Sequence, residues 1–176
     1  MRRHRTLPVA LALLALSTAG VLVFSGGSTA EPTASQELFK KTLLADEFTT
    51  NGVKELLEKR GGFVAPEIEF ADLTGDGRSD AIVLVETGGV AGAIALYVFS
   101  TDGEAEDSDL RAVYRSQRLY RATAEVAGAT LVMRIPRYVG GDDLCCPAKV
   151  VERVYVWSST AKTLRLRSSR EVRGPT

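Results

Sequence analysis

The spacing of hydrophobic and polar positions changes once along the chain, near Phe63. Across residues 36–60 (QELFKKTLLADEFTTNGVKELLEKR) apolar side chains recur every three or four positions, which is the spacing of one face of an amphipathic helix. Ser35 is a candidate N-cap at the start of this region, and Gly61–Gly62 are typical of a helix end. The polar residues 49–52 interrupt the pattern, which therefore predicts two short helices or one broken helix.

Beyond Phe63 the pattern has the period of β-strands, with turn clusters such as TGDGRS and TDGEAEDSD between the apolar runs. The predicted strands cover residues 67–73, 80–88, 93–101, 110–117, 120–127, 129–137, 150–158 and 163–172. The second and third runs are almost wholly apolar, which favours central positions in a sheet. Helices followed by consecutive strands predict an α+β domain, in which an N-terminal helix or broken helix pair packs on a meander-like antiparallel β-sheet.

The first 30 residues have the pattern of a secretory signal peptide. A basic start (MRRHR) is followed by a long apolar run and by the small residues SGGSTA, which predict cleavage after Ala30. The alternative is an uncleaved anchor, because the apolar run 6–24 approaches the ~20 residues that span a bilayer. We expect residues 31–176 to form a single exported domain, secreted or associated with the cell envelope, with no integral membrane segment unless the N-terminal run is retained.

Charge and composition narrow the function classes. Without residues 1–30 the chain has 19 basic and 22 acidic side chains, and this balance, together with export, disfavours nucleic-acid binding. Residues 31–109 are strongly acidic and residues 110–176 strongly basic, so we expect the two halves to complement each other. The only histidine is His4, inside the predicted signal peptide. The exported domain therefore lacks the residue needed for Ser-His-Asp or Cys-His catalysis and for histidine-ligated zinc.

The segment IEFADLTGDGRSDAIVLV has the oxygen-donor spacing of a calcium loop between two strands. The candidate ligands are Asp72, Thr74, Asp76, a backbone carbonyl near Arg78, and Asp80. Gly77 permits the sharp turn, and the loop resembles those of FG-GAP-type calcium sites. It is not an EF-hand, because Val83 stands where that motif needs glutamate. The alternative interpretation is a tight hairpin built by Asx-turns, with Asp80 capping the next strand.

Cys145 and Cys146 are the only cysteines, and they are neighbours followed by Pro147. A vicinal disulfide, two free thiols, an intermolecular bridge and a metal site are the four options. The oxidising environment outside the cell disfavours free thiols that persist. A tetrahedral metal site needs four ligands, and two thiolates without histidine supply only half of them. We therefore expect a vicinal disulfide with a structural role, which shapes a turn. The functional alternative is that the two cysteines form a redox-active pair.

Six arginines on or beside the predicted strands are candidates for a basic face that binds an anionic polymer or a lipid headgroup. They are Arg111, Arg115, Arg121, Arg153, Arg165 and Arg167. The alternative, which we favour, is that they pair with the acidic half of the domain.

Two motifs, GDGRSDAIVLV and GGDDLCCPAKVVERVYVW, together resemble the LppP/LprE-type lipoprotein family of the actinobacterial envelope, over roughly residues 66–170. The matching residues are Asp72, Asp76, Gly77, Asp80, Cys145, Cys146, Pro147, Tyr155 and Trp157. The chain has no cysteine at the end of its apolar run, where this family carries its lipid. The resemblance implies an envelope location and supplies no catalytic residues.

The sequence therefore favours a non-catalytic envelope domain that binds or scaffolds an unknown envelope component, with calcium as a candidate ion. The alternative is an exported enzyme. It would be either a thiol-disulfide oxidoreductase using Cys145 and Cys146, or a hydrolase in which Asp142 or Asp143 works with a second carboxylate.

Overall fold

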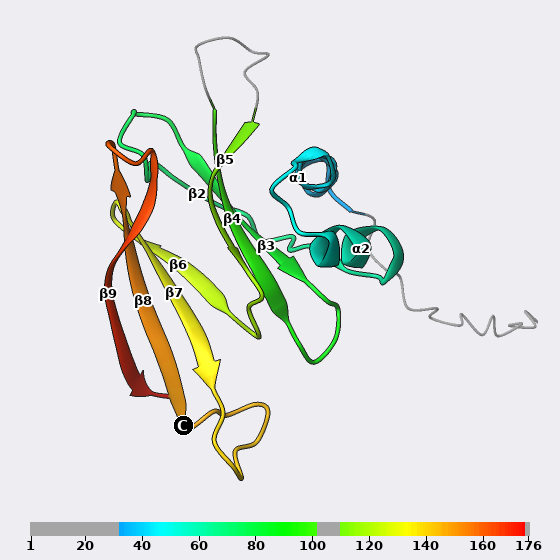
Figure 1. Cartoon of the computed structure of the whole chain (residues 1–176), viewed down its shortest axis with the longest axis vertical. Coiled ribbons are helices and arrows are strands. Elements are labelled where there is room, and N and C mark those ends of the chain that lie inside the picture. Colours follow the sequence, from blue (N-terminus) through cyan, green and yellow to red (C-terminus); the bar gives the residue numbers. More distant parts are fainter. Residues whose placement is uncertain (1–31, 102–109, 175–176) are drawn as a thin grey trace, which may run out of the picture. The chain divides into compact units, whose positions relative to one another are not determined.

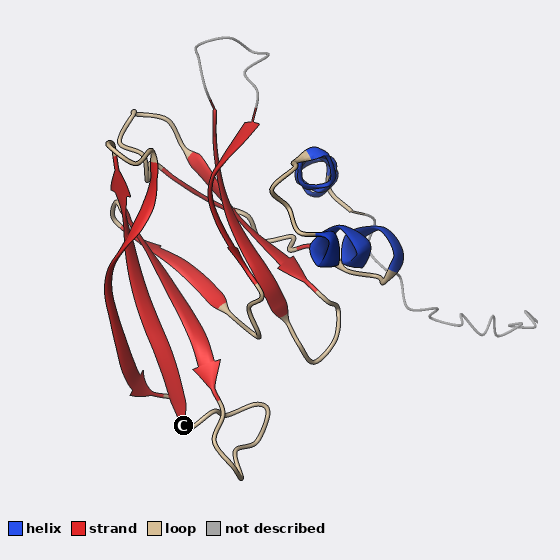
Figure 2. Cartoon of the chain, viewed as in Figure 1, coloured by secondary structure: helices blue, strands red, loops and turns tan. Residues whose placement is uncertain are grey.

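The computed structural model describes residues 32–101 and 110–174, which form two helices and two antiparallel sheets. The predicted α+β class is confirmed, and the helices precede the strands along the chain. The helices cover one face of the first sheet, and the second sheet lies on its other side (Figures 1 and 2). The predicted signal peptide lies outside the described residues.

The two predicted helices are α1, Ala34–Ala45, and α2, Asn51–Lys59. The N-cap of α1 is Thr33 and not Ser35, because Thr33 and Gln36 form a reciprocal capping box through their side chains and backbone N–H groups. Each helix buries one apolar stripe against the first sheet. The chain leaves α2 at Gly61, whose φ of 71° is readily adopted by glycine.

The first sheet has the order β1-β3-β4-β5, with β2 also paired to β3. Its strands are β1 Phe63–Val64, β2 Glu69–Ala71, β3 Asp80–Glu86, β4 Ala93–Thr101 and β5 Leu110–Gln117. The apolar runs predicted to be central are β3 and β4, and both faces of these strands are covered. The short strand β1 falls in a region that the sequence pattern left unassigned.

The second sheet is a meander with the order β6-β7-β8-β9. Its strands are β6 Thr123–Ala127, β7 Thr130–Arg137, β8 Lys149–Ser158 and β9 Thr163–Arg173. The antiparallel meander pairing is as predicted, but the strands are divided between two sheets. The division falls at residues 118–122, where Arg118 and Arg121 have φ values of 65° and 50° and turn the chain away from β5.

Two apolar cores hold the layers together. One lies between the helices and the first sheet and includes Phe39, Leu43 and Tyr97. The other lies between the two sheets and includes Leu96 and Met133, neither of which has any exposed surface. Alternate residues of β3 and β4 therefore belong to different cores, which explains why these strands are apolar at nearly every position.

The connection between the helices is attached to β5 by side chains. The guanidinium of Arg115 donates two hydrogen bonds, from Nε and Nη2, to the carboxylate of Asp46 at 3.0 Å, and it lies over the ring of Phe48. Burial opposes ionisation of Asp46, but the hydrogen bonds from Arg115 outweigh it and lower the pKa of this carboxyl. The side-chain oxygen of Gln117 also accepts a hydrogen bond from the backbone N–H of Thr50.

Three connecting segments lie together at one end of the strands: residues 87–92, 118–122 and 138–148 (Figure 1). The backbone N–H of Arg121 donates to the carbonyl of Ala91, and the rings of Tyr120 and Tyr138 meet edge to face. We call these three segments the loop end. The acidic segment 72–79 lies at the opposite end of β3. Neither described helix has the length and apolarity required to cross a bilayer.

Candidate functional site

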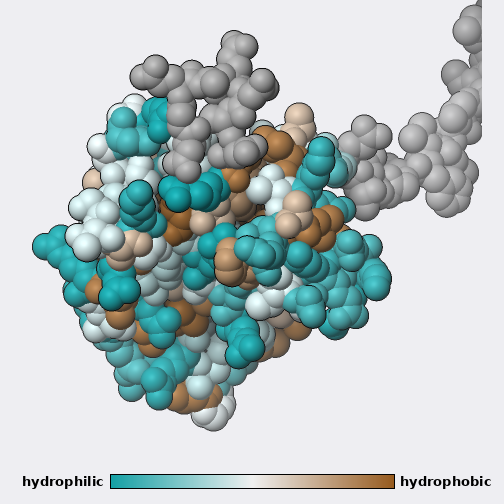
Figure 3. All heavy atoms as spheres, turned by 45° about the horizontal axis from the view of Figure 1, so that its top comes forward, coloured by the Kyte–Doolittle hydropathy of each residue, from teal (hydrophilic) through white to brown (hydrophobic). Residues whose placement is uncertain are grey.

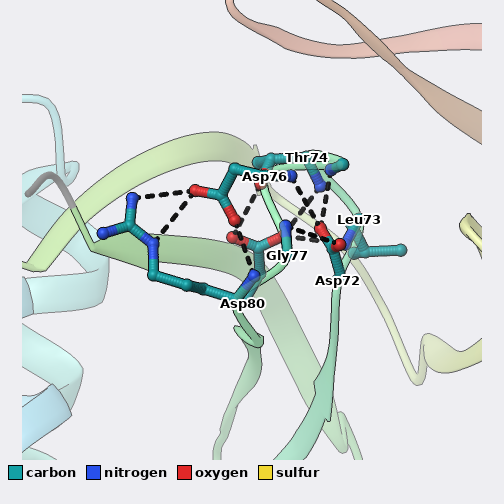
Figure 4. A network of polar contacts seen from close by, with 8 residues as sticks. Asp72, Leu73, Thr74, Asp76, Gly77 and Asp80 are labelled. Atoms are coloured by element: carbon teal, nitrogen blue, oxygen red, sulfur yellow. Dashed lines mark hydrogen bonds and ion pairs between the residues drawn. The ribbon is translucent and has the colours of Figure 1, made fainter. Parts of the chain in front are cut away.

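The acidic segment 72–79 is a tight turn closed by its own donors (Figure 4). The carboxylate of Asp72 accepts hydrogen bonds from the backbone N–H groups of Gly75, Asp76 and Gly77 at 2.6–3.2 Å. Gly77 has a φ of 84°, a conformation that glycine adopts without the strain of a Cβ atom. This arrangement is the Asx-turn that the hairpin interpretation predicts.

The other two aspartates of this turn are also engaged. Asp80 is 1% exposed and accepts hydrogen bonds from the N–H groups of Leu73 and Thr74 and from the Thr74 hydroxyl. Asp76 pairs with Arg78 at 2.9 Å, and the hydrogen bonds from Arg78 lower the pKa of this carboxyl. In Figure 4 the three carboxylates point toward different donors and do not converge on one point.

This geometry supports the hairpin role of the turn over a metal role. Within the described ranges, no group of three or more His, Cys, Asp or Glu side chains is placed to hold a metal ion. Calcium binding at this loop stays a prediction. A thermal melt with and without millimolar calcium tests it, since a bound ion raises the melting temperature by mass action.

Cys145 and Cys146 are bonded to each other, as the sequence predicts, in the segment between β7 and β8. Both are exposed, whereas Pro147 is buried. The carboxylate of Asp142 closes the base of this loop by accepting hydrogen bonds from Val139 and Ala148, both at 3.0 Å. These bonds lower the pKa of Asp142. A carboxyl held ionised in this way is poorly suited to act as a general acid.

Two further contacts hold the cysteine turn in place. The hydroxyl of Tyr138 donates to the carbonyl of Leu144 at 2.9 Å, across the loop. The backbone N–H of Gly174 donates to the carbonyl of Ala148, and the chain passes so close to Pro147 that a Cβ atom on Gly174 would lie 1.7 Å from the Pro147 carbonyl oxygen. The end of β9 therefore braces the turn.

A hollow of about 430 Å³ opens beside the disulfide. Its lining residues are Arg121, Thr123, Arg134, Pro136, Tyr138, Cys145, Pro147, Val150, Val172 and Arg173. Pro136, Val150 and Val172 are neighbours in the strand register and form an apolar floor on the face of the second sheet that lies away from the inter-sheet core. The cysteine turn forms one wall through Cys145 and Pro147, so the vicinal disulfide contributes part of the lining.

The three arginines of the hollow have different electrostatic environments. Arg134 is neutralised by Glu125 and Glu152, which it contacts at 2.7 and 3.1 Å. Arg121 uses one N–H to reach the carbonyl of Val90, and a guanidinium has five such donors. In the part of the chain that the structure describes, neither Arg121 nor Arg173 pairs with a carboxylate. Arg121 and Arg173 therefore line the hollow without a neutralising carboxylate among the described residues.

Arg121 is held in a conformation that few non-glycine residues adopt. Its φ is 50°, and its backbone N–H is fixed to Ala91. Gly92 permits this approach, because a Cβ atom there would lie 3.3 Å from the Cα atom of Arg121. Such backbone strain persists only where the surroundings enforce it, and it is concentrated at functional sites.

The structure does not gather the six predicted arginines on one face. Arg111 and Arg115 lie on β5 of the first sheet, whereas Arg153 and the pair Arg165 and Arg167 lie on β8 and β9 of the second. Arg115 is paired with Asp46, as the charge-complement interpretation expects. Of the six, Arg121 alone lines the hollow.

Sequence reasoning missed Arg134 and Arg173 as lining residues. Arg134 interrupts the apolar run of β7, and a charge at that position signals a face not covered by the core. Arg173 comes at the end of a basic, alternating segment and carries no signal of its own. Its position depends on how β9 pairs with β8, which only the fold reveals.

No family model, curated protein or solved structure was found to match this chain. The resemblance to the LppP/LprE-type family therefore rests on the two motifs alone, and it stays a prediction.

Proposed function

We propose that residues 31–176 form a non-catalytic binding domain of the cell envelope, and that its ligand is a small anion with an apolar body, held in the hollow beside the disulfide. The observation that carries this proposal is the lining of the hollow, where an apolar floor adjoins Arg121 and Arg173, two arginines without a carboxylate partner among the described residues. Mixed linings of this kind, with few polar groups fixing the orientation of a mostly apolar ligand, are typical of small-molecule sites.

The exported domain has no histidine, and the carboxylate of Asp142 already accepts two backbone hydrogen bonds. Both observations support binding over hydrolysis. The bond between Cys145 and Cys146 supports a structural role for the thiols. The export itself is supported by the N-terminal pattern. The intact mass of the secreted protein tests it, because the expected mass begins at Glu31.

A pair of fluorescent probes tests the site. We expect anilinonaphthalene sulfonate, an anion with an apolar body, to bind more tightly than its neutral analogue phenylnaphthylamine. The double variant Arg121→Gln/Arg173→Gln should weaken binding of the sulfonate about tenfold or more, because each charge-assisted hydrogen bond is worth about 1.5–3 kcal/mol. The matched control is Arg165→Gln/Arg167→Gln, which removes equal charge from β9 at positions outside the hollow. Equal effects of the two double variants, or equal binding of the two probes, would overturn the proposal.

A further inference from the structure

The vicinal disulfide is both part of the hollow and open to solvent. Cys145 is one of the lining residues, and Cys145 and Cys146 are both exposed. Exposure lets a dithiol in solution reach the bond, and exposed disulfides are reduced more readily than buried ones. A change in the redox state of this pair therefore acts directly on the wall of the proposed binding site.

The bonded pair is also connected to a second lining residue, Tyr138. The carbonyl of Leu144, directly before Cys145, accepts a hydrogen bond from the hydroxyl of Tyr138 at 2.9 Å. Because the two cysteines are neighbours, their bond closes a ring that includes the peptide between them and restricts the backbone rotations on either side of it. Opening the ring frees the side chain of Cys145 and loosens the turn that positions the acceptor of Tyr138.

The base of the cysteine turn is held by contacts that do not involve sulfur. The carboxylate of Asp142 accepts hydrogen bonds from the backbone N–H groups of Val139 and Ala148 at 3.0 Å. The backbone N–H of Gly174 donates to the carbonyl of Ala148, and Pro147 is buried. Reduction therefore loosens the tip of the turn, where it lines the hollow, and leaves the base of the turn and the sheets in place.

We infer that the bond between Cys145 and Cys146 is a redox switch for the hollow, in which the disulfide form holds the anionic ligand tightly and the dithiol form holds it weakly. This inference rests on the proposed function, and it adds the regulation of that site. A wall already fixed in its bound conformation loses less entropy when a ligand binds than a wall that is free to move.

The reductant in this step is a dithiol. One of its thiolates attacks a cysteine sulfur and forms a mixed disulfide, and the other cysteine leaves as a thiolate that takes up a proton. The second thiol of the reductant then displaces the attached cysteine. The reductant departs as a disulfide, and the cysteine pair has gained two electrons and two protons. Since the cysteines are neighbours in the chain, oxidation rejoins them without a rearrangement of the fold.

Titration with anilinonaphthalene sulfonate tests the inference on the oxidised domain and on the domain reduced by dithiothreitol, with thiol counting to verify both states. We expect reduction to raise the Kd of the probe about fivefold and reoxidation to restore it, because the loosened wall must be ordered again on binding. In Figure 3 the end opposite the loop end is turned toward the viewer. Hydrophilic side chains predominate there, with apolar ones in small patches, so that end offers the apolar body of the probe little to bind.

The variant Cys145→Ser/Cys146→Ser is the control for the reductant itself. It should bind the probe about as weakly as the reduced domain, and dithiothreitol should not change its Kd. A thermal melt of each form verifies that the domain stays folded, so that a weaker site is not mistaken for an unfolded one.

A second pair of variants tests the connection through Tyr138. Tyr138→Phe removes the hydroxyl that bonds the carbonyl of Leu144, so it should weaken probe binding by the oxidised domain and narrow the difference between the two redox states. Tyr120→Phe is the matched control, because the ring of Tyr120 meets that of Tyr138 but does not line the hollow. It should leave the difference between the redox states unchanged.

Several outcomes would overturn the switch and leave the proposed function standing. They are an equal Kd in the two states, tighter binding after reduction, resistance of the bond to dithiothreitol in the folded domain, and an equal response of the Cys145→Ser/Cys146→Ser variant to the reductant. Failure of the oxidised domain to bind the probe would overturn both proposals.

Discussion

Asp80 is an ionisable side chain with 1% of its surface exposed, and it is stable there because three donors surround it. Burial of a carboxylate is costly unless hydrogen bonds replace those of water. Asp80 supplies the acceptor for the backbone N–H of Thr74 and a second acceptor for that of Leu73, which also donates to the carbonyl of Ala71. It thus joins the start of β3 to the start of the acidic turn.

The change Asp80→Ala removes three hydrogen bonds at a buried site and is expected to lower the free energy of unfolding by about 2 kcal/mol, because the N–H of Thr74 loses its acceptor. Urea unfolding measures the loss. Asp76→Ala is the control, because the carboxylate of Asp76 pairs with Arg78 at the surface, and exposed ion pairs contribute about 0–1 kcal/mol. Equal losses in the two variants would contradict the structural role assigned to Asp80.

Tyr97 is buried against the helices, and its hydroxyl has no hydrogen-bond partner among the described residues. Burial raises the pKa of this phenol to about 12. We expect Tyr97→Phe to leave the domain equally stable or to stabilise it by about 1 kcal/mol, because removal of an unsatisfied hydroxyl relieves its desolvation. A thermal melt decides this, and a clear loss of stability would show that the hydroxyl has a partner.

At the scale of the element, the cysteine turn combines a bonded pair with three unrelated braces from Asp142, Tyr138 and Gly174. The disulfide closes almost no chain, so it removes little entropy from the unfolded state. Its contribution is therefore to the conformation of residues 138–148 and to the wall of the hollow.

We expect thiol counting on the denatured, unreduced protein to find no free thiol in a monomer. The variant Cys145→Ser/Cys146→Ser should change the free energy of unfolding by less than the ~2–4 kcal/mol typical of disulfides that close long loops. Hydrogen exchange should become faster within residues 138–148 while it stays unchanged in β3. Two free thiols, or a disulfide-linked dimer, would contradict this. Loss of a measured redox activity in the folded double variant would favour the oxidoreductase alternative.

The elements show what the sequence could predict. The period of apolar residues predicted both helices and the long strands β3, β4 and β8 within about three residues, since each buries a regular stripe. The N-cap was misplaced because Thr33 and Ser35 are both good acceptors, and only the position of Gln36 three residues after Thr33 decides between them. The vicinal bond was predictable because neither cysteine has another partner in the chain.

At the scale of the whole molecule, neither the division into two sheets nor the hollow could be predicted from the sequence pattern. Strand period states which face of a strand is buried but not which sheet the strand joins. The hollow draws Arg121, Cys145 and Val172 from distant parts of the chain, and their meeting depends on the register of β8 against its neighbours.

The outer face of the second sheet carries a charge network that ties three strands together. Glu152 lies between Arg134 and Arg170 in the register, and the hydrogen bonds from Arg170 and then Arg134 lower its pKa. A carboxyl whose folded pKa is depressed stabilises the fold above its unfolded pKa of about 4.3, and this contribution is lost as the pH falls through the folded pKa.

We therefore expect Glu152→Gln to lower stability at neutral pH and the difference from the unmodified domain to shrink as the pH falls below about 4. Melts across an acid pH series measure it. Glu67→Gln is the control, since Glu67 is exposed and makes no hydrogen bond or ion pair with the described residues. A difference that does not vary with pH would show that Glu152 acts through packing and not through its charge.

The hydrogen bond from the backbone N–H of Gly174 to the carbonyl of Ala148 has a consequence for where a purification tag is placed. Because β9 ends beside Pro147 and Arg173 lines the hollow, a purification tag or fusion partner attached after residue 174 would start next to the hollow. A tag placed there is expected to compete with a ligand of the proposed site. Binding measurements are therefore best made with the label ahead of α1.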